Sequence, residues 1–208
     1  MKLPNRISFS RIIISIIIII ILLFPFDSAG LTTHKIFINE AIVVDIKNII
    51  VAVLFMIGAA TDFFDGYYAK KYNCSTDFGK MIDAIADKIL IDSTLILLAT
   101  IGFIHPVIAV IVLVRDIAVD SIKRYAASKG IIIGSIKLAK IKTILFMVAI
   151  TMTLLYNLPF ELWNLKISDI LLVIATTMSI ISGFEYYKYI KETIKWIFIY
   201  SFFVWKYI

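Results

Sequence analysis

Four aspartates, arranged in two groups, are the residues of this sequence best suited to chemistry. Asp62 and Asp65 form the first group, and Asp83 and Asp87 form the second. Within each group the carboxylates are three or four residues apart, so each pair lies on one face of a helix. Because the connection between the groups is short, we expect the two helices to be antiparallel neighbours whose acidic faces converge on one pocket.

Small residues accompany the carboxylates on the same helical faces. Gly66 and Ala69 continue the face that begins at Asp62, and Gly79 lies one turn before Asp83. Where bulky side chains are missing, a ligand can approach the helix backbone closely. For the glycines alone, a packing notch between two helices is the alternative explanation.

Four neighbouring carboxylates cannot all stay ionised without cations. Hard oxygen ligands of this kind suit Mg²⁺ or Mn²⁺. Paired metals held by carboxylates are suited to phosphoryl chemistry, so we expect two ions. The predicted metal ligands are Asp62, Asp65, Asp83 and Asp87. Ordinary charges at helix ends in a solvated loop would explain one or two of these aspartates, but not the whole pattern.

A second set of charged residues is basic and could bind an anionic substrate. Arg115 follows Pro106 by about 14 Å of helix, and a charge at that depth should face an internal cavity, with Asp116 or Asp120 as its partner. Further cations near the cytoplasmic mouth are Arg124, Lys137, Lys140 and Lys142. The usual excess of basic residues in cytoplasmic loops would also explain the lysines. Arg11 could bind the anion or could only mark the start of the first span.

These residues belong to a chain of 208 residues that is 61% hydrophobic and only 17% charged. Soluble domains are near half apolar and a quarter charged, which argues against a soluble enzyme, a disordered chain and a fibrous repeat. We predict an all-α fold, a polytopic integral membrane bundle of about six transmembrane helices. The net charge of +6 suits anionic lipids or substrates. Because the cations are dispersed between apolar segments, no nucleic acid partner is expected.

Apolar stretches long enough to cross a bilayer recur along the chain. The expected spans are residues 12–26, 44–68, 82–104, 106–128, 141–157 and 168–190. Lysine and arginine concentrate at the N-terminus, in every second connection and after the last span. We therefore expect a multi-pass protein of a bacterial plasma membrane, with both termini and the acidic pocket in the cytoplasm. Residues 1–190 would form one membrane domain, and residues 191–208 an aromatic tail that forms an interfacial helix.

The acidic pattern resembles the signature of the CDP-alcohol phosphotransferase family. That signature reads D-x2-D-G-x2-A-R, then eight residues, then G-x3-D-x3-D. The matching positions here are Asp62, Asp65, Gly66, Ala69, Lys70, Gly79, Asp83 and Asp87. Lys70 stands where the family usually has Arg, so the charge is kept but bidentate geometry is lost.

Within the family, the sequence is most similar to phosphatidylglycerophosphate synthases over about residues 1–190. The similar segments are LPNRISFSR at 3–11, AASKG at 126–130, KIKT at 140–143 and SGFEYY at 182–187. Two departures are Asp116, where Glu is commoner, and Ala84, where Pro is usual.

The resemblance implies a homodimeric membrane enzyme of six helices that is embedded in membrane lipids. Its substrates would be CDP-diacylglycerol and sn-glycerol 3-phosphate, and its products phosphatidylglycerophosphate and CMP. Asp87 would be the general base. The cytidine nucleotide would contact Asp62, Gly66, Ala69, Lys70 and Gly79. The acceptor would then bind to the basic set of Arg115, Arg124, Lys137, Lys140 and Lys142, with Arg11 as a further candidate.

Two alternatives remain at this point. The signature is common to enzymes with other acceptors, so a cardiolipin, phosphatidylserine or phosphatidylinositol-phosphate synthase would carry the same aspartates. A transporter coupled to cations could use the aspartates as a cation site. It would be expected to have broken spans and internal symmetry, and neither is visible in the sequence.

Overall fold

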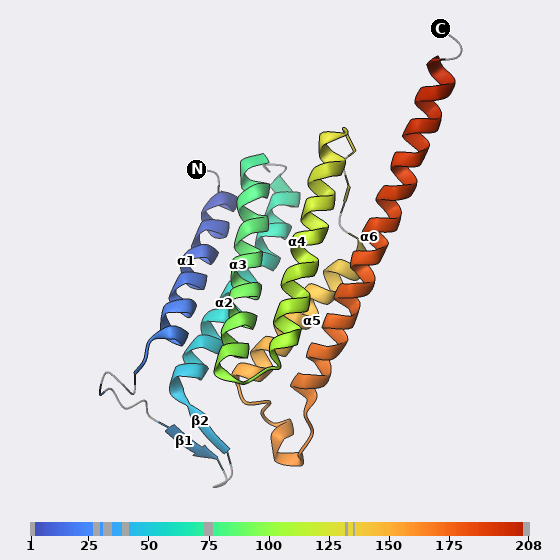
Figure 1. Cartoon of the computed structure of the whole chain (residues 1–208). Helices are drawn as coiled ribbons and strands as arrows, with labels where there is room; N and C mark the ends of the chain where they lie inside the picture. The colour runs from blue at the N-terminus through green and yellow to red at the C-terminus, as the bar shows by residue number, and fades with distance from the viewer. Residues whose placement is uncertain are drawn as a thin grey trace.

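Six long α-helices make up most of the part of the chain that the structure describes (Figure 1). They are α1 (Leu3–Leu23), α2 (Ile46–Tyr72), α3 (Asp77–Ile101), α4 (Pro106–Ser128), α5 (Lys137–Leu154) and α6 (Ile167–Trp205). This computed structural model describes residues 3–26, 30, 35–38, 42–72, 77–131, 133–134 and 136–205. For some of these residues the structure describes the backbone but not the side chain, namely residues 3–6, 37–38, 42, 63–72, 77, 80, 192 and 194–205. The predicted all-α fold is confirmed.

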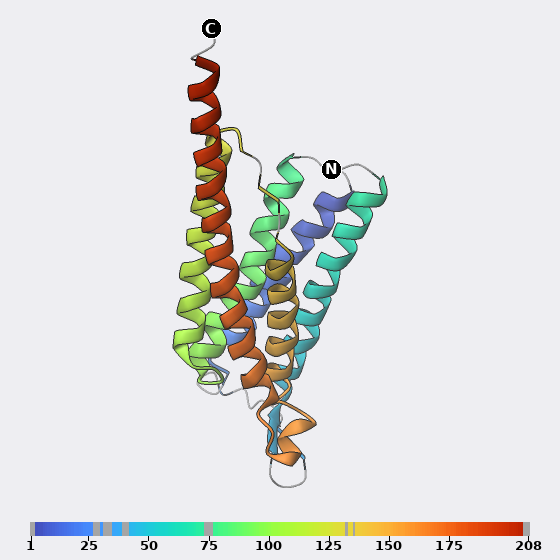
Figure 2. The ribbon, with the colours of Figure 1, turned by 90° about the vertical axis from the view of Figure 1, so that its right-hand side faces the viewer.

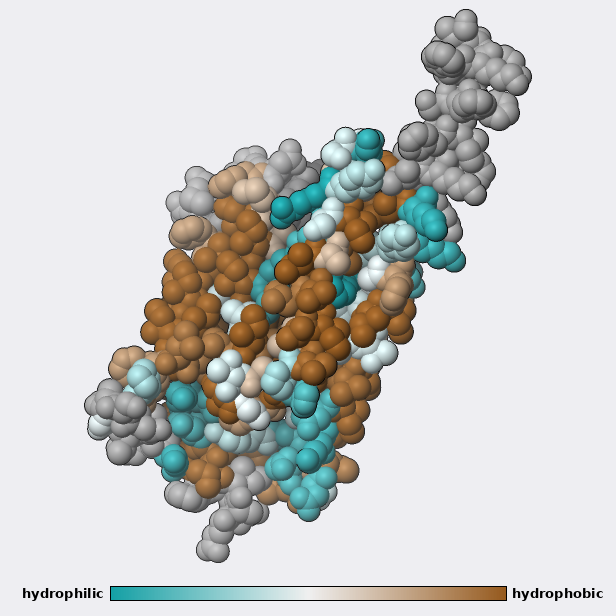
Figure 3. Space-filling view, in the orientation of Figure 1, coloured by the Kyte–Doolittle hydropathy of each residue, from teal (hydrophilic) through white to brown (hydrophobic). Residues whose placement is uncertain are grey.

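The number of membrane spans remains a prediction. Among the described residues, the segment Ile167–Lys191 is long and apolar enough to cross a bilayer, and Ile7–Leu23 is a shorter apolar helix. Many large apolar side chains on the outer faces of the helices are exposed, for example Ile20, Val114 and Ile144. Figure 3 shows the resulting hydrophobic surface across the middle of one face, with hydrophilic residues toward its ends.

Helix α1 packs along both α2 and α3, whereas α2 and α3 pack against each other less extensively. On the other side of the bundle, α6 packs along both α4 and α5 (Figures 1 and 2). The first residues of α1 and the end of α6 lie at the same end of the bundle. The ends of α2 and α4 reach that end too, so residues far apart in sequence can meet there.

A small β-hairpin lies at the opposite end of the bundle and was not expected from the sequence. Strands β1 (Lys35–Ile38) and β2 (Ile42–Asp45) are antiparallel, with Lys35 opposite Asp45. The 3₁₀ helix η1 (Phe160–Trp163) lies at the same end (Figure 1).

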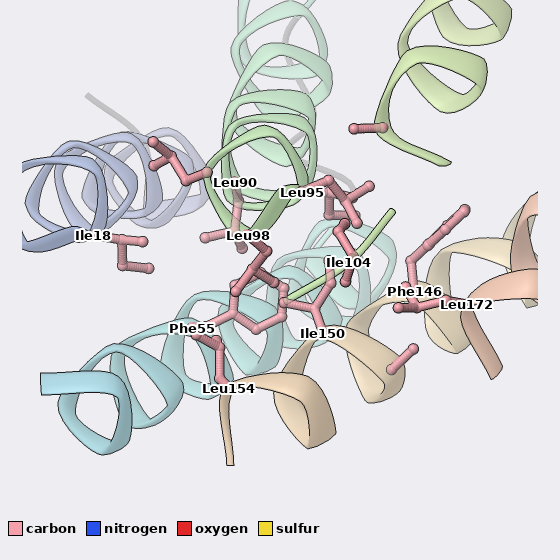
Figure 4. Packing of buried hydrophobic residues seen from close by; sticks show 14 of the residues in the cluster. Ile18, Phe55, Leu90, Leu95, Leu98, Ile104, Phe146, Ile150, Leu154 and Leu172 are labelled. Carbon is pink, nitrogen blue, oxygen red and sulfur yellow. The ribbon is translucent and has the colours of Figure 1, made fainter. Parts of the chain in front are cut away.

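The hydrophobic core is formed by side chains from all six helices (Figure 4). Phe55 of α2 and Ile150 of α5 are fully buried, as are Leu90 and Leu98 of α3. Gly58 permits close packing of α2 on α3, because a Cβ at this position would lie 3.0 Å from Leu90 Cδ2.

One face of α1 is buried along its whole described length. The buried positions are Ser8, Arg11, Ser15, Ile18 and Leu22. Their spacing alternates between three and four residues, which is the spacing of a single helical face. The half of this face nearer the start of α1 is polar, and the other half is apolar.

Helix α6 is longer than the sequence suggested. It runs without a break for 39 residues, or about 58 Å, which is nearly twice the thickness of a hydrocarbon core. The tail after residue 190, which we expected to form an interfacial helix, is a continuation of α6 and extends beyond the bundle in Figure 1. Its location at a membrane interface remains a prediction.

Asn157 organises the connection between α5 and α6. Its side chain is 95% buried, and its backbone φ is 55°. Its Nδ2 donates hydrogen bonds to Glu161 Oε2 at 3.1 Å and to the Leu165 carbonyl at 2.6 Å. Its Oδ1 accepts a hydrogen bond from the Ser168 amide at 3.1 Å, within the first turn of α6.

We expect Asn157→Ala to lower the melting temperature of the protein in detergent by about 5 °C, because buried groups would lose their hydrogen-bond partner. The matched control is Asn164→Ala, since Asn164 also has a positive φ, of 54°, but is exposed. Equal losses in the two variants would show that backbone conformation, rather than the hydrogen bonds of Asn157, stabilises this connection.

Candidate active site

Asp62 of α2 and Asp83 of α3 meet at the guanidinium of Arg11, which α1 contributes. Arg11 Nη1 lies 3.2 Å from Asp62 Oδ1 and 3.1 Å from Asp83 Oδ1. Ser8, one turn earlier on α1, donates a hydrogen bond to the same Asp83 oxygen at 3.3 Å. The Arg11 side chain is fully buried, whereas the Asp62 and Asp83 side chains are 34% and 43% exposed. This geometry confirms the predicted convergence of the two acidic faces for these two residues.

The arrangement of the helices differs from the expected one in one respect. The sequence predicted that α2 and α3 are antiparallel neighbours. They contact each other, but α1 packs along both helices more extensively. The N-terminal helix therefore contributes a cation to the centre of the acidic cluster.

Asp87 lies one turn after Asp83 on α3 and points into the bundle. Its Oδ1 is buried and has no hydrogen-bond partner among the described residues. The carboxylate interacts electrostatically with Asp62 and Asp83. A buried carboxylate oxygen without a hydrogen-bond partner destabilises the folded protein unless a cation or a proton donor reaches it.

Asp87 also lines a small cavity between α3, α4 and α5. The cavity has a volume of about 30 Å³, and its polar lining consists of Asp87, Lys88, Asp92, Thr143, Asp116 and Lys142. A space of this size with several polar groups can hold one water molecule. The cavity separates the acidic cluster from the buried cations described below.

The described residues contain no group of three carboxylate, histidine or cysteine side chains close enough to hold a metal ion. The fourth predicted ligand, Asp65, follows Asp62 by one turn of α2, but its side chain lies outside the described part. The unpartnered Oδ1 of Asp87, one turn after Asp83, fits a hard cation, because ionised carboxylates are oxygen ligands of the type that Mg²⁺ and Mn²⁺ prefer.

The predicted nucleotide contacts fall largely outside the described side chains. Gly66, Ala69 and Lys70 lie in the helical backbone of α2, on the turns that follow Asp62, but nothing further is described at these positions. Gly79 lies in the first turn of α3 and is partly buried.

Two of the predicted acceptor-binding cations share one buried carboxylate. Asp116 Oδ1 accepts hydrogen bonds from Arg115 Nη1 at 2.6 Å and from Lys142 Nζ at 2.7 Å. Arg115 also donates to α6, from Nε to the Ser179 carbonyl at 2.8 Å and from Nη2 to Ser182 Oγ at 2.5 Å. Asp116, predicted as a partner of Arg115, is confirmed as one.

Gly183 allows α6 to approach Arg115 this closely. A Cβ at position 183 would lie 3.3 Å from Arg115 Cγ and 3.4 Å from its Nε. Arg115 therefore links α4 to α6 in addition to placing a positive charge inside the bundle.

The other three predicted cations are separate from this buried pair. Arg124 lies near the end of α4, and Lys137 and Lys140 lie in the first turn of α5; all three are exposed. The structure therefore divides the basic set into a buried pair and an exposed group.

Several residues of the site were not found from the sequence. Ser8 contacts Asp83, Ser179 and Ser182 contact Arg115, and Asp92 lines the cavity beside Asp87. The available signal for Ser8 was the polar stripe on an isoleucine-rich helix. No local signal indicated that the two serines of α6 would face α4.

Comparisons with known proteins agree with this site. The family model described as CDP-alcohol phosphatidyltransferase matches residues 1–201. The chain is 36% identical over 194 residues to a Bacillus subtilis (strain 168) protein named CDP-diacylglycerol–glycerol-3-phosphate 3-phosphatidyltransferase, covering 93% of this chain and 97% of that protein. Relatives with the same name are 34% identical in Rickettsia typhi (91% and 97% covered) and 32% identical in Mycoplasma pneumoniae (93% and 89% covered).

The family match includes all of the acidic cluster and extends past residue 190 into the last part of α6. Since it covers nearly the whole chain, and the named relatives align over nearly all of their own length, the chain belongs to the CDP-alcohol phosphatidyltransferase family.

Proposed function

We propose that this protein transfers the phosphatidyl group of CDP-diacylglycerol to sn-glycerol 3-phosphate, giving phosphatidylglycerophosphate and CMP. The observation that carries the proposal is the convergence of Asp62 and Asp83 from separate helices, with Asp87 one turn further along α3, whose Oδ1 has no partner among the described residues. The name shared by relatives from several bacterial genera supports this choice of substrates within the family.

In the proposed reaction, the primary hydroxyl of glycerol 3-phosphate attacks the phosphorus atom that carries diacylglycerol. The bond from this phosphorus to the oxygen of the CMP phosphate breaks, CMP leaves with that oxygen, and the hydroxyl loses its proton. The protein must hold two anionic substrates together, accept one proton and accommodate the charge on the leaving phosphate.

The residues present fit divalent metal ions, which Asp62, Asp65, Asp83 and Asp87 would hold. Bound Mg²⁺ or Mn²⁺, which we propose as a pair, would neutralise the pyrophosphate and the charge that develops on the leaving phosphate. The small residues Gly66, Ala69 and Gly79 would give the nucleotide access to α2 and α3, and Lys70 would contribute a positive charge.

We assign proton acceptance to Asp87 Oδ1. This oxygen is buried, and no donor among the described residues competes with the attacking hydroxyl for it. A positioned carboxylate that accepts the proton of the attacking hydroxyl contributes about 10²- to 10⁴-fold to a rate.

The acceptor phosphate needs cations. Lys142 lines the same small cavity as Asp87, and Arg115 shares the Asp116 carboxylate with Lys142. The exposed cations Arg124, Lys137 and Lys140 would attract the anion toward this end of the bundle. The acceptor site would then lie between the acidic cluster and α4, α5 and α6.

We further propose that the protein is a multi-pass homodimer in the plasma membrane, with its termini and active site in the cytoplasm. The exposed apolar side chains on the helices and the location of both chain ends at one end of the bundle support this topology.

The proposal is tested by measuring CMP release from CDP-diacylglycerol by the purified protein in detergent, with a panel of acceptors. Glycerol 3-phosphate should be the preferred acceptor. Preference for serine, phosphatidylglycerol or inositol phosphate would assign the protein to another activity, and no CMP release with any acceptor would contradict the transferase proposal.

Arg115→Gln should raise KM for glycerol 3-phosphate about tenfold to a hundredfold, because a hydrogen bond to a charged group contributes about 1.5–3 kcal/mol. KM for CDP-diacylglycerol should change little, since that substrate binds at the acidic cluster. The measurement is a matrix of initial rates in which both substrates are varied.

Lys188→Gln is the control for this prediction, because Lys188 is an exposed cation of α6 that is not assigned to either substrate. Equal increases in both KM values for Arg115→Gln, together with a lower melting temperature, would show that Arg115 only links α4 to α6.

A further inference from the structure

Arg11 has no part in the transfer reaction as proposed above, although it occupies the centre of the acidic cluster. It has no exposed surface, and a single nitrogen, Nη1, lies within 3.2 Å of a carboxylate from α2 and of another from α3. One guanidinium therefore bridges the two helices that carry all four predicted metal ligands.

Two buried serines of α1 flank Arg11. Ser8 donates to Asp83 Oδ1 one turn before Arg11, and Ser15 donates to the Arg11 carbonyl at 2.8 Å one turn after it. Both serines are almost completely buried. Polar side chains buried on an isoleucine-rich helix are costly unless they make hydrogen bonds, and here both serines make them.

The negative charges of the acidic cluster explain why a buried cation such as Arg11 is needed. Asp62, Asp83 and Asp87 repel one another when ionised, and the repulsion is greatest when no divalent ion is bound. Metal ions dissociate, whereas an arginine side chain stays protonated and remains attached to the protein.

We propose that Arg11 is the permanent counter-ion of the metal site, a positioning residue that holds Asp62 and Asp83 together when metal is absent. This inference rests on the proposed function, because it takes these aspartates as metal ligands. It assigns Arg11 to the carboxylates and not to the acceptor phosphate.

The test is thermal unfolding of Arg11→Gln in detergent, with EDTA and with saturating Mn²⁺. In EDTA the variant should melt about 10 °C below the wild type, because removal of one partner leaves carboxylates without compensation. Mn²⁺ should restore most of this loss, so the rise in melting temperature on adding Mn²⁺ should be several times larger in the variant than in the wild type.

Two further variants separate the charge from packing. Arg11→Lys keeps the charge and should recover at least half of the stability in EDTA. The double variant Arg11→Gln/Asp83→Asn removes the repelling charge as well, and should be more stable in EDTA than Arg11→Gln alone. Lys188→Gln, at an exposed position of α6, serves as the control for the loss of a positive charge elsewhere.

An equal loss of stability with and without Mn²⁺ would overturn the inference, because Arg11 would then serve packing alone. An Arg11→Gln protein as stable as the wild type in EDTA would overturn it too.

Electron paramagnetic resonance of Mn²⁺ bound to the wild type tests the proposed function separately. Absence of bound Mn²⁺ would contradict the metal site, while the comparison of variants in EDTA would still decide the role of Arg11.

Discussion

Asp87→Asn should lower kcat by about 10²- to 10⁴-fold, because the variant lacks the group that accepts the proton of the attacking hydroxyl. Asparagine has nearly the same size, so folding should be preserved, and the KM values should change far less than kcat. The measurement is CMP release at saturating concentrations of both substrates. Asp62→Asn and Asp83→Asn should each also lower the rate by at least about 10²-fold, since both residues are proposed metal ligands.

Asp169→Asn is the matched control, because Asp169 is exposed in the first turn of α6 at the opposite end of the bundle. It should keep the rate of the wild type. A loss of less than tenfold in Asp87→Asn would remove Asp87 from the reaction, and near-normal rates in any two of the three variants would show that the acidic cluster is not the active site.

Removal of divalent metal should abolish the activity, with a decrease of at least about 10³-fold, because several kcal/mol of charge stabilisation would be lost and each 1.36 kcal/mol is a factor of ten. The experiment adds excess EDTA to the purified protein and then returns Mg²⁺ or Mn²⁺ in excess of the chelator. Activity should recover, since the metal-free cluster keeps Arg11 as an internal cation.

EDTA that is already saturated with Mg²⁺ is the control for effects of the chelator on the detergent or the lipid substrate. It should leave the rate unchanged. Full activity in excess free EDTA would contradict the assignment of the aspartates as metal ligands.

The helices were predicted well wherever hydropathy alone determines them. The expected span 106–128 coincides with α4, which begins at Pro106, and proline is favourable at the first position of a helix. The first helix begins at Leu3 rather than after Arg11, because polar residues on a buried face carry no hydropathy signal. The continuation of α6 beyond residue 190 was not predicted from the sequence. The composition becomes richer in aromatic residues there, but a change in composition does not require a break in a helix.

The sequence predicted those features of the active site that depend on which face of a helix a residue occupies. Asp62 and Asp83 converge as their positions on the helical faces suggested. Arg115 was expected to face inward and to pair with Asp116 or Asp120, and it pairs with Asp116. The contacts of Arg11 with the aspartates and of Arg115 with Ser179 and Ser182 depend on which helices pack together, and the spacing of residues within one helix does not contain that information.

The burial of Arg11 has a consequence for the synthesis of the protein. Helix α1 leaves the ribosome before Asp62 and Asp83 have been made, so its guanidinium has no carboxylate partner when the helix first meets the bilayer. An unpaired charge is costly inside hydrocarbon, and a long basic side chain near a helix end extends to the head groups instead. In the proposed membrane topology, helix α1 can therefore dock fully only after α3 is inserted, which makes its docking a late step of assembly. Truncated chains that end before α3 should leave Arg11 accessible to arginine-specific reagents from the aqueous phase, whereas the complete protein should protect it.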